Sequence, residues 1–461
     1  MVRKMKVIKL IPVFIIFSYC ILYTQEPFSI KVAIHYALNN SIKLATLKSR
    51  VESSKLIIHE RWRDLLPYVT IQYTKNDEVA IHEEDIRNQS LLCTANYDIF
   101  TNKRALIAYS IAKLESFLSI EEYAIEKNNI ILSTKKAYYD LQKKKKAIEI
   151  YNLLLDSLHL QKKIIIAQQK LGMATDLEQI QIDGKIAEAQ YNIITAQNDY
   201  SNTLKDFATT LAVESSIIVV NEPSYTEIAN ISLPSKERLI WLSLQNRNEL
   251  KKSHYTVIKT EKEYALAEYY YLPKIQLFTS YGYMGNDYPP NKKTWNIGIS
   301  ITSALLGNTV TTGQTYGKKD NENTTTLDTN ASVQIYNEPD YIRNIVDAEA
   351  AYTEAKKTFD QLKRIIESDV SKAYDNLIES RKKIEIAQQN TNLLEKQALI
   401  ENEQVRLGDI TRYDVMKTLV ELSQARLRLQ ETLTDVYLAM AALENAIGLP
   451  IESLFQLDIN E

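Results

Sequence analysis

Several long stretches of the chain repeat hydrophobic residues at alternating three- and four-residue spacing. The last of them has apolar residues at Val415, Leu419, Leu422, Leu429, Leu433, Val436, Met440, Leu443 and Ile447. This spacing is typical of a coiled-coil helix rather than of a helix in a globular domain. An earlier stretch carries two apolar stripes, one being Leu177, Ile180, Gly184, Ala187, Tyr191 and Ile194, the other Ile182, Ile186, Ala189, Ile193 and Ala196. A helix with two such stripes is expected to pack on two sides, as in the wall of a tube.

Four shorter segments alternate between apolar and polar residues instead. They are residues 68–76, 90–100, 274–284 and 294–302. This period of two predicts strands that have one apolar and one polar face. The strands lie at the ends of helices about 100 Å long, where no packing layer is expected to cover the apolar face. Strands of this length and pattern suit a barrel in an outer membrane.

The chain contains two tandem copies of one unit. Residues 136–213 align with residues 372–449 at a constant offset of 236, without a gap. The segments before them align at an offset of 206, so that Leu66-Pro67 recurs as Leu272-Pro273. Shared composition alone does not easily produce two gapless registers. We therefore divide the chain into a first repeat and a second repeat.

The sequence pattern of each repeat predicts a helix, two strands, a long helix, a sharp turn and a shorter helix. The first repeat is placed at residues 25–232 and the second at 233–461. The predicted helices are 28–66, 102–170 and 174–212 in the first repeat, and 235–272, about 340–406 and 410–447 in the second. A polar insertion rich in Thr, Asn and Gly, at about 304–338, follows the fourth strand. Either it is a loop near the membrane boundary, or residues 331–336 resume the strand and the insertion lies outside it.

The first 24 residues are expected to be a signal peptide. Basic residues precede an apolar run from Leu10 to Leu22. As a helix this run would reach about 20 Å, too short for a hydrocarbon core of roughly 30 Å, and the pattern is typical of a secretory signal. Cys20 is either a lipidation site or a residue lost with the signal.

Composition excludes several classes of protein. The 461 residues include only 10 Gly and 10 Pro, which leaves little room for a loop-rich sandwich or a Rossmann-type sheet. The 55 basic and 58 acidic residues give a net charge of −3, so nothing favours nucleic-acid binding. Two Cys and five dispersed His offer no metal site, and no catalytic motif stands out. We predict no enzyme activity, no metal and no cofactor.

Four strands cannot close a barrel, because closure needs about eight or more. Three chains would contribute twelve strands. An open sheet edge in lipid would leave backbone groups unpaired, so the oligomer is expected to be obligatory. The predicted fold is mainly helical with membrane β-structure: a duplicated helix–strand–strand–helix unit that forms a trimeric 12-stranded β-barrel joined to a long coiled α-helical barrel.

The duplicated order of these elements resembles the TolC family of outer-membrane efflux proteins. Residues 295–301 (WNIGISI) are similar to that family's fourth strand, and residues 171–178 (LGMATDLE) and 407–415 (LGDITRYDV) resemble its two periplasmic hairpin tips. The resemblance covers residues 28–449. It implies a homotrimer in outer-membrane lipid of a Gram-negative-type, diderm bacterium, with a large periplasmic portion.

The resemblance also implies a function. The chain would be the outer-membrane channel of a tripartite efflux or type I secretion system, a passive duct that docks a periplasmic adaptor (membrane fusion) protein and an inner-membrane pump of RND or ABC type. The alternative is an exported coiled-coil structural or adhesive protein without a channel, in which the strands form a small soluble sheet.

The two hairpin tips hold the candidate docking residues. Gly172 and Gly408 are expected to reverse the helices, because glycine accepts the positive φ that such a turn needs. Turn chemistry alone explains both glycines. The resemblance implies in addition that these glycines, with Leu171 and Leu407, contact the adaptor.

Candidate gate residues follow the tips. The resemblance implies that Asp414 lines the pore constriction, where three carboxylates would attract cations. Alternatively, Asp414 only stabilises the N-terminus of its helix. Lys417 lies at i+3, can neutralise this charge, and is assigned to the same constriction. The resemblance also implies that Glu178 bonds a neighbouring helix to hold the gate closed, and Arg412 is the candidate for a second inter-helix contact there.

Overall fold

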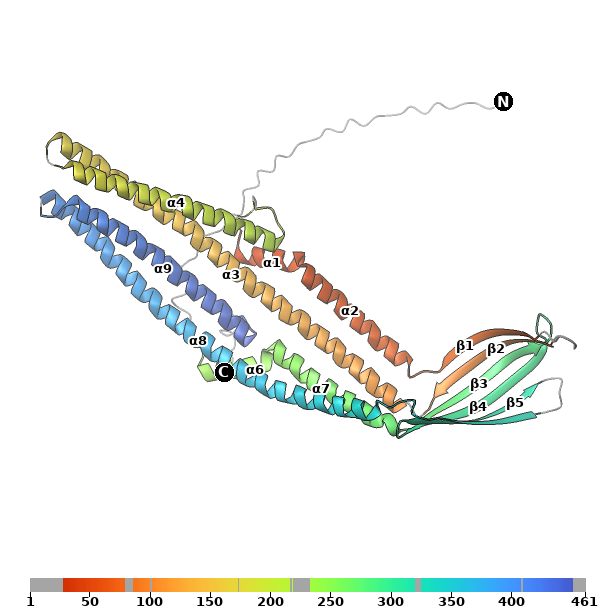
Figure 1. Cartoon of the computed structure of the whole chain (residues 1–461). Coiled ribbons are helices and arrows are strands. Elements are labelled where there is room, and N and C mark those ends of the chain that lie inside the picture. Colours follow the sequence, from red (N-terminus) through yellow and green to blue (C-terminus); the bar gives the residue numbers. More distant parts are fainter. Residues whose placement is uncertain are drawn as a thin grey trace, which may run out of the picture.

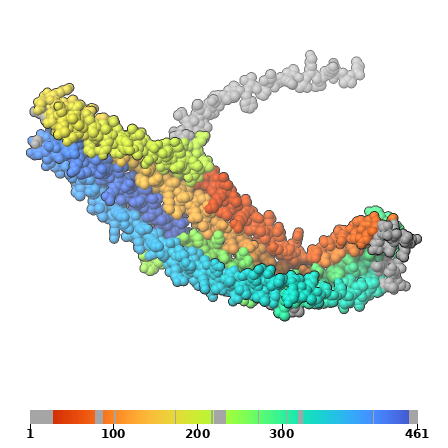
Figure 2. Space-filling model, viewed as in Figure 1, coloured from red at the N-terminus to blue at the C-terminus, as the bar shows by residue number. Residues whose placement is uncertain are grey.

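The computed structural model describes residues 28–78, 86–99, 102–172, 174–215, 218, 233–319, 325–407 and 409–450. The molecule is long and slightly bent, with helices along most of its length and a sheet at one end (Figures 1 and 2). The predicted signal peptide, Cys20 and Gly408 lie outside the described residues. Among the described helices, none combines the length and apolar character needed to cross a membrane.

The helices follow the predicted duplication. The first repeat contains α1 (Ile30–Asn40), α2 (Ile42–Arg63), α3 (Asn102–Lys170) and α4 (Asp176–Leu211), and the second contains α6 (Lys236–Asn246), α7 (Asn248–Glu268), the 3₁₀ turn η2 (Tyr269–Tyr271), α8 (Tyr341–Leu407) and α9 (Arg412–Ile447). The long helices α3 and α8 have 69 and 67 residues and so extend about 100 Å. Figure 1 shows the hairpin α3–α4 beside the hairpin α8–α9, with both turns at the end opposite the sheet.

The short helix at the start of each repeat is broken, whereas the sequence predicted continuous helices at 28–66 and 235–272. Ser41 and Arg247 have extended backbone conformations, with ψ of 111° and 116°. Ser41 begins α2, because its hydroxyl accepts a hydrogen bond from the backbone N–H of Leu44 at 3.2 Å. Arg247 precedes α7 without a capping side chain.

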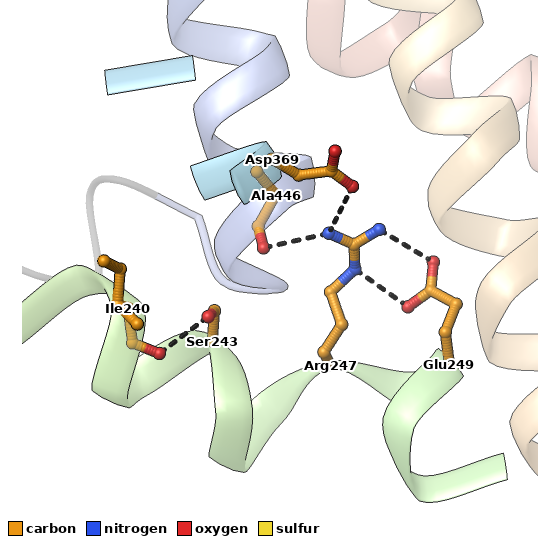
Figure 3. A network of polar contacts seen from close by, with 6 residues as sticks. All are labelled: Ile240, Ser243, Arg247, Glu249, Asp369 and Ala446. Carbon is orange, nitrogen blue, oxygen red and sulfur yellow. Dashed lines mark hydrogen bonds and ion pairs between the residues drawn. The ribbon is translucent and has the colours of Figure 1, made fainter. Parts of the chain in front are cut away.

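Side chains at these breaks bind the C-terminal end of the last helix of each repeat, α4 or α9. Figure 3 shows Arg247 donating from Nη1 to the carbonyl oxygen of Ala446 at 3.2 Å. The same guanidinium pairs with Glu249 at 3.0 Å and lies 4.0 Å from Asp369. In the first repeat, Asn40 Nδ2 donates to the carbonyl of Leu211 at 2.8 Å. Carbonyls in the last turn of a helix have no partner within that helix, so both contacts satisfy groups that would otherwise be open.

One of the two apolar stripes predicted for α4 is buried inside the chain. Its buried residues include Ile182, Ile186, Ala189, Ile193 and Ala196, which is the second stripe as predicted. The first stripe faces outward, and its exposed large side chains are Leu177, Ile180, Tyr191 and Ile194. The chain therefore covers only one of the two sides on which α4 is expected to pack.

The sheet has two more strands than predicted. It is antiparallel in the order β1-β2-β3-β4-β5-β6, and its strands are β1 (Tyr68–Glu78), β2 (Ile86–Asp98), β3 (Lys274–Gly285), β4 (Lys292–Leu305), β5 (Asn308–Lys319) and β6 (Thr325–Gln334). The first four are the predicted strands. The predicted polar insertion forms β5 and β6, so it is neither a loop nor a resumption of β4. Leu306 and Gly307, with φ of 52° and 79°, turn the chain back after β4.

The insertion was difficult to predict because its composition is that of a loop. Its Thr residues are nevertheless β-branched and fit a pleated sheet. β5 pairs with β4 from Thr294↔Lys319 to Leu305↔Asn308, and β6 pairs with β5 from Thr309↔Gln334 to Lys318↔Thr325. The extra hairpin is thus a continuous part of the sheet.

Candidate functional site at the helix tips

The first tip is a tight helix reversal with an exposed leucine. Gly172 has φ of +73°, and its N–H donates to the carbonyl of Gln169 at 2.9 Å. A Cβ at Gly172 would have no heavy atom within 4 Å, so the backbone conformation requires the glycine and crowding does not. Leu171 is 72% exposed at this tip, and Leu407 is 78% exposed at the other.

Both helices that leave the tips begin with a capping box. In α4, the Thr175 N–H donates to Glu178 Oε2 at 2.9 Å, and the Glu178 N–H donates to Thr175 Oγ1 at 3.3 Å. In α9, the Thr411 N–H donates to Asp414 Oδ2 at 3.1 Å, and the Asp414 N–H donates to Thr411 Oγ1 at 3.4 Å. The structure thus gives both candidate gate carboxylates a local role, in satisfying helix N-termini.

The environment of Asp414 favours its charged form. The hydroxyl of Thr411 donates to its carboxylate at 2.6 Å and lowers the pKa of Asp414, and the Thr411 N–H and the charge of Lys417 act in the same direction. Asp414 is therefore ionised at neutral pH. The amino group of Lys417 is exposed and lies 3.9 Å from the carboxylate of Glu421, one turn further along α9.

Arg412 joins the second tip to the first repeat. Its Nε donates to Gln168 Oε1 at 2.8 Å and its Nη1 to Gln161 Oε1 at 2.9 Å, both on α3. Gln161 in turn donates from Nε2 to Asn402 Oδ1 on α8 at 3.2 Å. Burial lowers the pKa of Arg412, and the charge of Glu178 opposes this shift. Arg412 therefore contacts α3 of the other hairpin through two glutamines, whereas the hydrogen bonds of Glu178 are with Thr175 of its own hairpin.

The sequence did not lead us to predict Gln161 and Gln168 as hydrogen-bond acceptors for Arg412. A signal for them existed, since Gln161 and Gln168 lie seven residues apart and recur as Gln397 and Gln404 in the second repeat. The two repeats differ at the residue that pairs with these glutamines. The position equivalent to Arg412 is Asp176, which accepts a hydrogen bond at 3.3 Å from Gln169 of its own hairpin.

The fold and one sequence region match known proteins. The model of the family described as outer membrane efflux protein matches residues 239–449, which is almost all of the second repeat. The second repeat carries the sequence pattern of the outer membrane efflux protein family. This family consists of outer-membrane transport channels, not of enzymes, and its members have a large periplasmic portion. No curated protein matches the sequence.

Solved structures of outer-membrane channels share the fold of this chain. The channel protein CusC is 14% identical with a TM-score of 0.75, and 92% of each chain is covered. VceC from Vibrio cholerae is 14% identical with a TM-score of 0.73, and the match covers 92% of this chain and 96% of VceC. The open state of MtrE from Neisseria gonorrhoeae is 12% identical with a TM-score of 0.72, covering 92% and 89%. At these identities the likeness establishes the fold.

Proposed function

We propose that three copies of this chain form the outer-membrane channel of a tripartite efflux or type I secretion system. The channel is a passive exit duct that carries out no chemistry. The observation that carries this proposal is a sheet with one apolar face, placed at the end of a helical shaft about 100 Å long. The exposed large apolar side chains on that face are Val69, Ile71, Tyr73, Leu91, Tyr281, Tyr283, Trp295, Ile297, Ile299, Ile301, Tyr316, Leu327 and Val333. Lipid is the medium that suits such a face.

The duplication suggests how neighbouring copies pack in the helical part. Within the chain, α9 lies against α3 (Figure 1). The equivalent partner of α4 is α8, which the chain itself does not bring to the exposed stripe of α4. That stripe and the exposed Ile386, Leu393 and Ile400 of α8 fit each other across a boundary between copies. Each large apolar side chain so buried contributes about 1.5–3 kcal/mol.

The tips support docking of a periplasmic adaptor (membrane fusion) protein. Leu171 and Leu407 are among the most exposed leucines at the end farthest from the sheet, where a partner can reach them. Gly172 sets the turn that presents Leu171, and Gly408 stays a docking candidate from the sequence. The adaptor would connect the channel to an inner-membrane pump of RND or ABC type.

The polar residues after the tips support a gate. Asp414 is charged and exposed, so three copies would place three carboxylates around the threefold axis. Arg412 ties α9 to α3 through Gln161 and Gln168, which holds the second hairpin against the first. In this proposal the closed state keeps these hydrogen bonds, with Glu178 nearby, and opening breaks them.

Membrane fractionation of the full-length protein tests the channel. We expect it in the outer-membrane fraction, extractable with detergent but not with carbonate, with a mass three times that of the mature chain. Purified trimers should conduct ions in planar bilayers. A carbonate-extractable, water-soluble monomer would overturn the proposal and favour the exported coiled-coil protein.

A further inference from the structure

The two edges of the sheet lie at β1 and β6. Within the described part of the chain, β1 pairs only with β2 and β6 pairs only with β5. The outer edge of β4 is occupied by β5 from Thr294 to Leu305. A neighbouring chain could reach β4 only by displacing β5.

β6 also takes the position that leads into the last long helix. In the first repeat, β2 ends at Asp98 and α3 begins at Asn102. In the second repeat, β6 ends at Gln334 and α8 begins at Tyr341, whereas β4 leads into the added hairpin. The strand next to each long helix is therefore β2 in one repeat and β6 in the other.

The added hairpin is anchored at its helix end. The backbone N–H of Glu338 donates to the carbonyl of Gly307 at 3.2 Å. The N–H of Tyr336 donates to Asn308 Oδ1 at 2.9 Å, and Asn337 Nδ2 donates to Thr309 Oγ1 at 2.8 Å. These contacts join the β4–β5 turn and the start of β5 to the segment that enters α8, and they hold the hairpin in the plane of the sheet.

The two-faced pattern of the sheet continues across the hairpin. On the face of Ile297, the paired residues of β5 and β6 are Tyr316 and Leu327, and Trp295 lies 5.7 Å from Tyr316 between ring centroids. The whole row on this face reads Val310, Thr312, Gln314, Tyr316 and Lys318 in β5, and Thr325, Leu327, Thr329, Ala331 and Val333 in β6. The opposite face of β6 carries Thr326, Asp328, Asn330, Ser332 and Gln334. β6 thus has the apolar and polar faces of a barrel strand, in register with β4.

We infer that β6 of one copy pairs with β1 of the next, and that the closed barrel has eighteen strands instead of twelve. The inference rests on the proposed trimer. Six strands from each of three chains give eighteen, and β1 and β6 have matched lengths of 11 and 10 residues. The physical reason is that an unpaired edge in lipid leaves backbone groups without partners, so the edge that remains free must be the one that closes the ring.

The larger strand number changes the shape of the duct. Barrel diameter grows roughly linearly with strand number, so the ring is about one and a half times as wide as a twelve-stranded one. The polar faces of β5 and β6 then line the interior. The membrane section is the wide part of the duct, and the narrow part lies at the helix tips.

Cysteine cross-linking between copies tests the closure. The full-length chain, with Cys20 and Cys93 replaced by Ser, would carry Thr329→Cys in β6 together with Val69→Cys, Ile71→Cys or Tyr73→Cys in β1. All four positions lie on the lipid-facing side, and the β1 series scans the unknown register. A bond between facing strands is feasible because paired Cβ atoms lie about 4.5–5.5 Å apart. We expect covalent dimers and trimers on non-reducing gels for at least one pair.

A matched set replaces Thr329→Cys with Ile299→Cys in β4. Links from Ile299→Cys to β1 would mean that β4 closes a twelve-stranded ring, which overturns the inference and leaves the proposed channel intact. A membrane trimer without links in either set also overturns it. A soluble monomer without links would overturn both proposals. As a second measurement, a density map of the purified trimer should resolve eighteen strands, and twelve would contradict the inference.

Discussion

The two repeats have the same plan but use different polar residues at its helix breaks and tips. At the break of the short helix, neutral Asn40 holds the end of α4, whereas charged Arg247 holds the end of α9. At the tips, Asp176 bonds within its own hairpin and Arg412 reaches the other repeat. At the breaks, the comparison teaches that the duplicated backbone sets where a donor is needed, and that the side chain supplying it is free to change.

The repeats also differ in the sheet. The first contributes a plain hairpin, and the second contributes that hairpin plus β5 and β6. The helical part can therefore keep a near-sixfold arrangement of hairpins in a trimer, while the barrel can be only threefold. Four changes would sharpen this comparison, from the largest expected effect to the smallest.

Arg247→Ala should destabilise the protein more than Asn40→Ala. The substitution removes the hydrogen bond to the Ala446 carbonyl and leaves Glu249 and Asp369 without this cation. We expect the free energy of unfolding to fall by about 3 kcal/mol, because the lost hydrogen bonds come from a charged donor. Loss of the neutral hydrogen bond of Asn40 should lower it by about 1 kcal/mol. The midpoints of urea denaturation of the trimer in detergent measure the loss of stability in both variants. Equal losses would contradict the comparison.

Arg412→Ala should favour an open second tip. Losing two hydrogen bonds from a charged donor costs about 1.5–3 kcal/mol, which would shift the closed-to-open ratio about 10- to 150-fold. Single-channel conductance in bilayers measures this shift in the closed-to-open ratio. Asp176→Ala is the matched control, because its bond stays within one hairpin. If both variants conduct like the parent protein, Arg412 does not hold the gate.

Removing the threonine of each capping box should have equal effects. Thr175→Ala and Thr411→Ala should each lower the free energy of unfolding by about 1 kcal/mol, since both threonines cap a helix in the same geometry. Urea denaturation in detergent measures this, and Thr→Ser at the same positions should restore most of it. A loss at only one cap would show that the tips are not equivalent.

Asp414→Asn should have the smallest effect. It removes an exposed charge that salt screens, so we expect cation block of the channel to weaken by less than about threefold at 0.1 M salt. The carboxylate's pKa is below its ordinary 3.8, so block by the parent protein should persist as the pH falls and disappear only below that value, as the group takes up a proton. Bilayer recordings across pH check this; block that weakens near pH 5 would point to another group.

Local patterns predicted much of this molecule. The three- and four-residue spacing gave the long helices, the alternation in segments such as 294–302 gave the first four strands, and the duplication gave their order. The turn at Gly172 was predicted for the same reason, because a glycine that follows a helical pattern is a local signal for helix reversal. Patterns of this kind depend on neighbours in the sequence, and the sequence displays them directly.

Other features were decided by the tertiary structure. Arg412 meets Gln161 at a separation of 251 residues, and Arg247 meets Ala446 at 199. The hairpin β5–β6 is composed like a loop and becomes sheet because β4 offers it an open edge. The sequence alone therefore determined the helices of the two long hairpins and the first four strands, whose patterns involve residues close in the sequence. Only the folded chain decided which distant carbonyls and strand edges found partners, because an open backbone group takes whichever donor the packing brings to it.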